Sequence, residues 1–376
     1  MKVALLCDFA FWEGRLGSSV RVESLCHSLS KVCDMTVICS LTLPSKYRTQ
    51  LLEAPYQFYD RRRLEYEVKK DITPPLPGVR ADRQVVVKGI NRVLQVEGYD
   101  AVITPYFNRE WMIAHLPKNI VNIVDTIDCQ SQRARSFAVH GLTPKFILTP
   151  EAEGALLDRY DMALALSEPD QAEFFELSKT PMVTAPFRLP PKPCYTVRQQ
   201  SNSVLFIAAQ SDVNNMTLSY LMEQVLPLVN RDIELNIVGN VTIPDITSPN
   251  VTVIRHEGVD DLREIYSTVD LALNPTYAGG GIKTKTLEAI AFGVPVITSD
   301  EGARGLLNLL PETLIANDKE TFAHRINTLL QDPVKRLILS KEMCDRLENE
   351  NSDSWLEPFV KILSVKIDEK RRQFST

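Results

Sequence analysis

The sequence predicts a two-domain α/β protein: two Rossmann-like domains, each with a parallel sheet, facing across a cleft. Three observations support this fold class. Short apolar runs alternate with segments of helical periodicity along the chain. Glycine turns follow several of these runs, which is typical of parallel sheets that bind ligands at the carboxyl ends of their strands. A proline-rich stretch, 181–200, separates one α/β series from the next.

The first series opens with a continuous apolar run at residues 2–8, which predicts a buried parallel strand. A helix over 20–32 and a strand over 35–41 complete a βαβ unit. Residues 42–81 show no clear period and are expected to be irregular. Further elements are predicted at 83–96 (helix), 100–106 and 119–126 (strands), and within 150–177 (helix, strand, helix). We assign 1–185 to an N-terminal domain.

The second series follows a linker at 186–200 and forms a domain over 201–355. Its apolar runs predict five strands, and the segments between and after them carry helical periodicity. The strands are expected at 203–210, 233–239, 251–259, 271–276 and 295–299, and the helices at 216–229, 260–270, 284–292, 320–332, 334–349 and 355–372.

Composition excludes several classes of protein. The net charge of −6 argues against bulk nucleic-acid binding, and no apolar run approaches the roughly 20 residues of a spanning helix. The first residues are too strand-like for a signal peptide. Seven scattered cysteines without a C-x-x-C pair indicate core residues in a reducing compartment, with neither a disulfide framework nor a metal site. We expect a cytoplasmic protein.

The most informative stretch is 274–306. A strand end leads into Gly279, Gly280 and Gly281, then Lys283 and Lys285, and a helix that carries Glu288. Glycines let backbone N–H groups approach a phosphate closely, and a helix N-terminus adds partial positive charge. A carboxylate farther along that helix can hold a ribose or sugar hydroxyl. The pattern predicts a bound nucleotide.

The run Lys285-Thr-Leu-Glu288-Ala-Ile-Ala-Phe-Gly293-Val-Pro-Val-Ile297 resembles the nucleotide-sugar signature of the retaining GT-B glycosyltransferases of glycosyltransferase family four. The resemblance covers the second half of the chain well and the first half loosely. It implies that the final helix, 356–376, returns to the N-terminal domain. It also implies a set of donor-binding residues: Gly279, Gly280, Gly281, Ile282, Lys283, Thr284, Lys285, Glu288, Ser211 and Arg304.

The segment Asp125–Arg133 is similar to a pattern found in bacterial members of that family, after a central strand of the acceptor domain. With Lys285 and Glu288, we therefore include Asp125 and Asp128 among the candidate catalytic residues. The alternative is structural: Asp128 caps the next helix and Asp125 ties down the loop. Gly17 and Arg133 are the expected residues on the acceptor side.

One position departs from the family pattern. The E-x7-E motif places its first glutamate at residue 280, where this chain has glycine. Backbone N–H groups then have to hold the donor sugar, or the choice of donor differs. The resemblance implies a retaining hexosyltransferase that uses a UDP- or GDP-sugar and needs no metal or other cofactor. The alternatives are a non-catalytic GT-B partner subunit and a UDP-sugar epimerase.

The resemblance also implies an acceptor that is a glycan, a lipid-linked sugar or another glycoconjugate. The basic stretch within 42–81, which includes Arg61, Arg62 and Arg63, has two interpretations: a solvated face, or an edge that contacts a membrane or an acceptor. The second interpretation predicts a peripheral protein at the inner face of the membrane.

Overall fold

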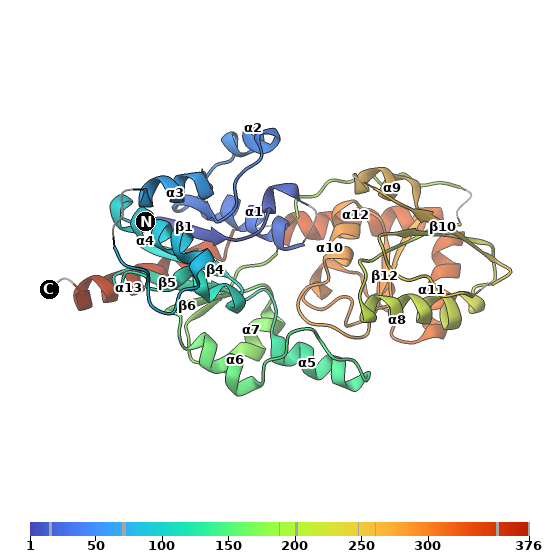
Figure 1. Cartoon of the computed structure of the whole chain (residues 1–376). Helices are drawn as coiled ribbons and strands as arrows, with labels where there is room; N and C mark the ends of the chain where they lie inside the picture. The colour runs from blue at the N-terminus through green and yellow to red at the C-terminus, as the bar shows by residue number, and fades with distance from the viewer. Residues whose placement is uncertain are drawn as a thin grey trace. The chain divides into compact units, whose positions relative to one another are not determined.

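The computed structural model describes residues 1–14, 17–69, 73–187, 189–199, 202–246, 248–259, 261–350 and 353–374. Contacts divide the chain into two units (Figure 1). The first unit contains Met1–Cys129, Leu148–Arg188 and Asp353–Thr376; the second contains Gln130–Ile147 and Leu189–Ser352. The predicted bounds placed 130–147 in the N-terminal domain, whereas its contacts group it with the second unit. Residues 188, 200 and 201, at the predicted linker and domain bounds, lie outside the described residues, as do 375 and 376.

The first unit is built on a seven-stranded parallel sheet with strand order β3-β2-β1-β4-β5-β6-β7. Its central strands are buried on both faces, which explains why they are continuous apolar runs in the sequence. The strands are β1 Lys2–Cys7, β2 Asp34–Cys39, β3 Gln57–Tyr59, β4 Ala101–Pro105, β5 Val121–Asp125, β6 Met162–Ala165 and β7 Met182–Thr184.

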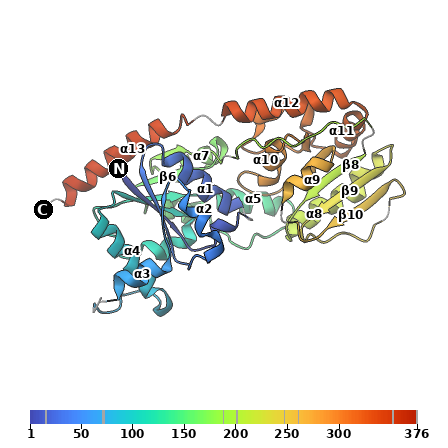
Figure 2. The ribbon, with the colours of Figure 1, turned by 90° about the horizontal axis from the view of Figure 1, so that it is seen from above.

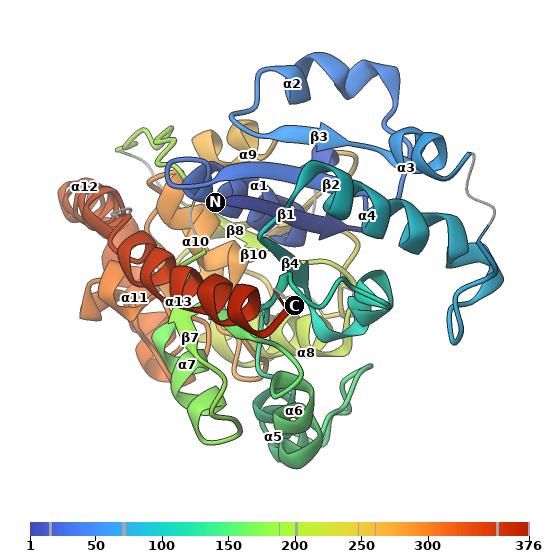
Figure 3. The same ribbon diagram turned by 90° about the vertical axis from the view of Figure 1, so that its left-hand side faces the viewer.

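Helices cover both faces of this sheet (Figure 3). Alternate residues of β1 point to opposite faces: Leu5 packs in a cluster with α1 and α13, and Leu6 in a cluster with α3 and α4. Leu356, Phe359, Leu363 and Ile367 repeat at helical spacing, so α13 buries one apolar stripe. The helices are α1 Gly17–Leu29, α2 Arg48–Leu52, α3 Arg61–Val68, α4 Gln84–Glu97, α6 Pro150–Leu157, α7 Glu168–Phe175 and α13 Leu356–Phe374, with 3-10 turns at Phe11–Glu13, Ser45–Tyr47, Ala81–Arg83 and Phe107–Ile113.

The prediction of irregular structure over 42–81 was confirmed for 73–80 but was wrong for 45–68. This part forms α2, the edge strand β3 and the helix α3, whose first turn is capped by Asp60 accepting from the Arg62 N–H. Arg61 and Arg63 pair with Glu65 and Glu67 one turn later. Because most residues of α3 are charged, its sequence shows no clear apolar periodicity, and this short amphipathic helix was not predicted. The strand β7 was also missed, because only three residues of the proline-rich stretch pair with β6.

A buried ion pair joins distant parts of the first unit. Arg21 of α1 and Asp125 at the end of β5 are 2% and 1% exposed, so water screens neither charge. The guanidinium donates to both carboxylate oxygens, with Nε–Oδ2 of 3.1 Å and Nη2–Oδ1 of 2.8 Å. The third guanidinium nitrogen, Nη1, donates to the carbonyls of Ala185 and Pro186, beyond β7. This one side chain therefore holds a helix, a central strand and the exit from the sheet together.

The second unit has a five-stranded parallel sheet with order β10-β9-β8-β11-β12. The two predicted parallel-sheet α/β domains are thus confirmed. The strands are β8 Ser203–Ile207, β9 Ile233–Val238, β10 Val251–His256, β11 Leu271–Asn274 and β12 Val296–Thr298. The helices are α5 Gln130–Val139, α8 Asp212–Tyr220, α9 Leu262–Thr268, α10 Thr284–Ala291, α11 Lys319–Gln331 and α12 Pro333–Glu350, of which the last two pack against each other (Figure 2). A π-helical turn at Leu221–Val225 extends α8, and 3-10 turns lie at Leu226–Leu228, Leu307–Leu309 and Glu312–Leu314.

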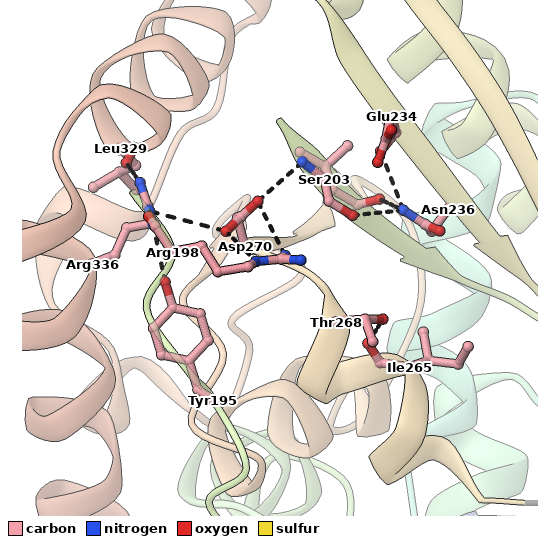
Figure 4. A network of polar contacts seen from close by, with 11 residues as sticks. Tyr195, Arg198, Ser203, Glu234, Asn236, Ile265, Thr268, Asp270, Leu329 and Arg336 are labelled. Atoms are coloured by element: carbon pink, nitrogen blue, oxygen red, sulfur yellow. Dashed lines mark hydrogen bonds and ion pairs between the residues drawn. The ribbon is translucent and has the colours of Figure 1, made fainter. Parts of the chain in front are cut away.

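A polar network anchors the segment that leads into this unit (Figure 4). Arg336 of α12 is fully buried and donates to the Tyr195 hydroxyl at 2.9 Å and the Arg198 carbonyl at 2.7 Å. Asp270 is also buried and accepts from the Ser203 N–H at 3.1 Å and from Arg198 at 3.3 Å. The proline-rich residues before β8 are therefore part of the second unit's packing. In the described residues, no helix is both long and apolar enough to cross a bilayer.

The Arg21–Asp125 pair makes a testable prediction. Asp125→Ala leaves a guanidinium buried without its carboxylate, so we expect the free energy of unfolding to fall by about 3–5 kcal/mol. All three tryptophans, Trp12, Trp111 and Trp355, belong to the first unit, so their fluorescence during urea unfolding reports on this unit. Arg61→Ala is the control, because its exposed ion pair is worth less than about 0.5 kcal/mol. A loss for Asp125→Ala no larger than the control's would contradict the assignment.

Candidate functional site: a glycine loop at a helix N-terminus

The glycine loop lies at the carboxyl edge of the second sheet, where β11 ends and α10 begins. Neighbouring parallel strands end at the same edge, so loops gather there around a ligand. Gly279 and Gly281 have φ of 150° and 59°, which side chains rarely tolerate. The residue before α10, Lys283, provides no side-chain cap, so the first N–H groups of this helix are not satisfied by a capping side chain. The local sequence thus produces a turn and a helix start that present N–H groups.

A chain of buried hydrogen bonds fixes this loop. Asn274 Nδ2 donates to Thr286 Oγ1 at 2.7 Å, and Thr286 Oγ1 donates to the Gly302 carbonyl at 2.8 Å. Thr298 Oγ1 closes the set by donating to the Asn274 carbonyl at 2.9 Å. A Cβ on Gly302 would lie 2.1 Å from Thr298 Oγ1, so only glycine fits at this turn. These bonds connect β11, α10 and the turn after β12.

A pocket of about 670 Å³ opens beside the loop, and all of its lining residues belong to the second unit. One wall is the glycine loop with the first residues of α10. The second is the start of α8, residues 210–214. The third is α5 and the segment after it, with Arg133, Phe137 and residues 142–146. The third wall was not predicted, because no sequence pattern indicates that residues before 150 lie beside this sheet.

Lys283 holds the loop in shape. Its ammonium group lies 2.7 Å from Glu301 Oε1 and donates to the carbonyls of Gly280 and Gly281 at 3.3 and 3.2 Å. The lysine lines the pocket, and its side chain is only 10% exposed. Because its charge already has a carboxylate partner, it contributes less to an incoming anion than Lys285 does.

Lys285 and Glu288 form a titratable pair on the first turns of α10. Lys285 Nζ donates to Asn214 Oδ1 at 2.9 Å and lies 5.5 Å from the centre of the Phe206 ring. Removal from water, followed by repulsion from Lys283, lowers the pKa of Lys285 to about 8. Removal from water raises the pKa of Glu288 to about 7, although the charge of Lys285 opposes this shift. Among the described residues, none donates a hydrogen bond to the Glu288 carboxylate.

Of the other predicted donor residues, Ser211 lies in the pocket lining and Arg304 does not. Ser211 lines the pocket and caps α8, because its hydroxyl accepts from the Asn214 N–H at 3.2 Å. Arg304 is half-buried in the turn after β12 and does not line the pocket. Ile282 and Thr284 both line it.

Arg133 lies beside the glycine loop, although it was predicted for the acceptor side. It lines the pocket from α5, and its guanidinium is 5.7 Å from the centre of the Phe137 ring. A Cβ on Gly280 would lie 2.8 Å from the Arg133 Cβ and 3.3 Å from its Cγ. One turn along α5, Ser136 accepts from the Gly279 N–H at 3.0 Å. The helix α5 therefore packs on the loop at the position where the family motif has its first glutamate.

The remaining predicted residues belong to the first unit. Gly17 is the first residue of α1. Both carboxylate oxygens of Asp125 are bound by Arg21, which favours the structural alternative for this residue. Asp128 is 7% exposed and follows Ile127, whose φ of 66° is unusual for a β-branched residue. Within the described ranges, no cluster of three or more His, Cys, Asp or Glu side chains has the arrangement of a metal site.

The two shifted pKa values set the pH dependence of this site. Glu288 is protonated more readily in the folded chain, so its contribution to stability is present below about pH 4.5 and is lost as pH rises to about 7. Lys285 behaves in the opposite sense: its contribution is present above about pH 10.5 and is lost as pH falls to about 8. Between about pH 7 and pH 8 both groups are charged in the folded chain, which lowers folding stability relative to their neutral forms.

We therefore expect affinity for a nucleotide sugar to be highest between about pH 7 and 8, where the ammonium and the carboxylate coexist. Calorimetric titrations across this range measure it. Glu288→Gln should remove the loss of affinity on the acidic side. The control Glu257→Gln changes an exposed carboxylate and should leave the profile unchanged. A flat profile for the unaltered protein would refute the assigned pair.

The contact between Gly280 and Arg133 makes a second prediction. Gly280→Glu supplies the glutamate of the family motif, but its Cβ would clash with the Arg133 side chain. Overpacking costs about 1–3 kcal/mol, so nucleotide affinity should fall by roughly tenfold. Gly280→Ala adds only the Cβ and should lose less. Tighter binding by Gly280→Glu in a calorimetric titration would show that the loop accepts the motif residue.

Part of the second unit is similar to a known family. Residues 201–332 match the family "Glycosyl transferases group 1". A protein of Klebsiella pneumoniae, described as an uncharacterized 44.6 kDa protein in the cps region, is 30% identical over 141 residues. That match spans 33% of this chain and 36% of the relative's length.

Solved structures share the fold over nearly the whole chain. TarM has a TM-score of 0.72 at 9% identity, covering 96% of this chain and 99% of TarM. Sucrose-phosphate synthase from Thermosynechococcus elongatus has a TM-score of 0.64 at 15% identity, covering both chains completely. HepE from Anabaena, in complex with UDP-glucose, has a TM-score of 0.60 at 14% identity and also covers both chains completely. Residues 201–332 are thus similar to the group 1 glycosyltransferases, and the chain as a whole shares the two-domain α/β fold of these solved structures.

Proposed function

We propose that the protein is a retaining hexosyltransferase that moves a sugar from a UDP- or GDP-sugar to a glycan, a lipid-linked sugar or another glycoconjugate. One observation carries the proposal: a glycine loop, an uncapped helix N-terminus and a half-buried lysine meet in one pocket of about 670 Å³. This arrangement suits a diphosphate, because N–H groups, the helix dipole and an ammonium group all stabilise negative charge. Glu288, one turn further along α10, suits the ribose hydroxyls.

The geometry also suggests how the reaction is accelerated. When the bond between the anomeric carbon and the diphosphate breaks, negative charge develops on the leaving phosphate. Donors that are already aimed at this position stabilise the transition state more than the ground state. The N–H groups of the glycine loop, Thr284 and Lys285 provide such donors, and Lys283 keeps the loop in place through Glu301. These cationic and N–H groups can take the role that a divalent metal has in other transferases.

Retention is part of the proposal. In the family that the sequence resembles, the leaving phosphate assists the acceptor and no enzyme nucleophile is needed. Asp125 is a positioning residue in this scheme, because Arg21 occupies both of its oxygens. Asp128, at the carboxyl end of the first unit's sheet, is our candidate for orienting an acceptor hydroxyl, with Gly17 in the same unit. Arg304 remains a candidate for donor binding from outside the pocket.

Similar proteins support the kind of substrate. The TarM structure from S. aureus with a TM-score of 0.69 contains UDP and α-GlcNAc-glycerol, and HepE was solved with UDP-glucose. The Klebsiella relative comes from a cps region, which supports a role in polysaccharide biosynthesis. We place the protein in the cytoplasm or at the inner face of the membrane.

The donor site is tested by two substitutions. Lys285→Ala removes an ammonium group from the pocket, and Glu288→Ala removes the carboxylate that is proposed to accept hydrogen bonds from the ribose hydroxyls. Each should weaken UDP or GDP binding by about tenfold to a hundredfold, which corresponds to the loss of one charge-assisted hydrogen bond. Lys319→Ala and Glu320→Ala are matched controls, since both residues are exposed at the start of α11 in the same unit. Unchanged nucleotide affinity in both site variants would refute the donor site.

Transfer itself is measured by incubating the protein with nucleotide sugars and acceptors and following the products by mass spectrometry. A transferase releases the nucleoside diphosphate and adds one sugar to the acceptor with the anomeric configuration of the donor. An epimerase would change the donor sugar without an acceptor, and a non-catalytic partner would bind without turnover. Activity should persist in excess chelator. Loss in chelator, with recovery in Mg²⁺ or Mn²⁺, would contradict the metal-independent scheme.

A further inference from the structure

We infer that the first unit has a binding site of its own, a pocket beside the edge strand β3 that takes the phosphate and an apolar chain of an anionic phospholipid at a membrane surface. The pocket has a volume of about 740 Å³ and lies between α2, β3 and the start of α3. All of its lining residues belong to the first unit, and Figure 3 shows α2 beyond the β3 edge of the sheet. The inference does not depend on the proposed transfer reaction.

The floor of this pocket is apolar, and its rim carries an exposed leucine. Leu43, Leu51 and Tyr56 are each 7% exposed, and Phe58 is half-buried. Leu52 also lines the pocket but is 78% exposed, so its side chain lies at the rim in contact with water. An exposed leucine beside cations is typical of surfaces that insert between the head groups and acyl chains of a membrane.

The pocket also carries a positive charge that the protein does not neutralise. Three arginines line it, against one carboxylate. Arg62 pairs with that carboxylate, Asp60, at 2.7 Å, and Arg63 pairs with two glutamates outside the lining. Arg48 is exposed and, in the part of the chain that the structure describes, has no ion-pair partner. Its guanidinium is therefore available to attract an anion.

These features together match a lipid phosphate better than a soluble anion. A free phosphate or a sugar phosphate would leave the leucines in water, whereas a phospholipid brings a phosphate and acyl chains to the same place. The chain as a whole has a net charge of −6, so its general charge opposes contact with an anionic membrane, and attachment depends on this pocket. The membrane interpretation of residues 42–81 thus moves from the arginines at 61–63 to Arg48 and Leu52.

Vesicle flotation tests the inference. Vesicles of phosphatidylcholine alone are compared with vesicles of phosphatidylcholine and phosphatidylglycerol in equal parts. The protein should bind the anionic vesicles about fivefold to tenfold more tightly, and added salt should weaken this binding. Arg48→Gln should lower the affinity for anionic vesicles by about fivefold, as expected for one basic residue near such a surface. Leu52→Ser should lower it by roughly tenfold, as expected for the loss of one buried leucine side chain.

Arg255→Gln and Leu307→Ser are the matched controls, because both residues are exposed in the second unit. Both controls should bind vesicles as tightly as the unaltered protein does. Urea unfolding followed by tryptophan fluorescence should be unchanged in Arg48→Gln and Leu52→Ser, because neither side chain is buried. A loss of vesicle binding in these two variants would then reflect the pocket and not the folding of the first unit.

The inference is overturned if the protein binds neither kind of vesicle, or binds both equally well. It is also overturned if neither pocket variant binds anionic vesicles less tightly than its control, because another surface would then be responsible. Displacement of the protein from vesicles by glycerol phosphate, which lacks acyl chains, would reduce the pocket to a site for soluble phosphate and overturn it as well. Nucleotide binding is measured separately by calorimetry, so none of these outcomes affects the proposed function.

Discussion

The hydrogen bonds from Asn274 to Thr286 and from Thr286 to Gly302 are the constraint on which the candidate site depends. They join the end of β11, the first turn of α10 and the turn after β12 inside a region closed to water. In such surroundings, each unmade bond would cost about 1–3 kcal/mol. The glycine loop is thereby held at the carboxyl edge of the sheet, where it lines the pocket. Its Gly279 N–H donates to Ser136 Oγ, and the uncapped start of α10 leaves N–H groups that suit binding to an anion.

The same frame explains why the two charged side chains of α10 have shifted pKa values. Packing against the sheet removes Lys285 and Glu288 from water, so each favours its neutral form more than it would at the surface. A ligand with a diphosphate and ribose hydroxyls would supply the partners that water no longer provides. Burying these two charged groups therefore lowers folding stability, and a ligand that supplies partners for them recovers part of that free energy on binding. Such shifted pKa values are common where proteins bind charged substrates.

Sequence patterns predicted some features of the fold and the site, whereas others depend on tertiary contacts. The apolar runs predicted both parallel sheets, because a strand buried on two faces has to be apolar throughout. They failed at β3 and β7, where three residues are too few to show a period, and at α3, where charges masked a helix. The glycine–lysine stretch predicted the wall of the pocket made by one continuous segment. The other walls, residues 210–214 and 133–146, are distant in sequence and are brought in only by folding.

The amino-acid sequence by itself determined the fold class, the loop conformation at Gly279 and Gly281, and the positions of Lys285 and Glu288 one turn apart, because these depend on neighbouring residues. Only the tertiary structure decided the roles of Arg21, Asp125 and Arg133. The first two meet across 104 residues of chain, and Arg133 packs over Gly280 from a helix that precedes the second sheet. Such contacts follow from how helices and strands pack together, and no local pattern encodes them. The structure gives a physical reason why residue 280 is glycine: the Cβ and Cγ atoms of Arg133 occupy the space that a side chain would need.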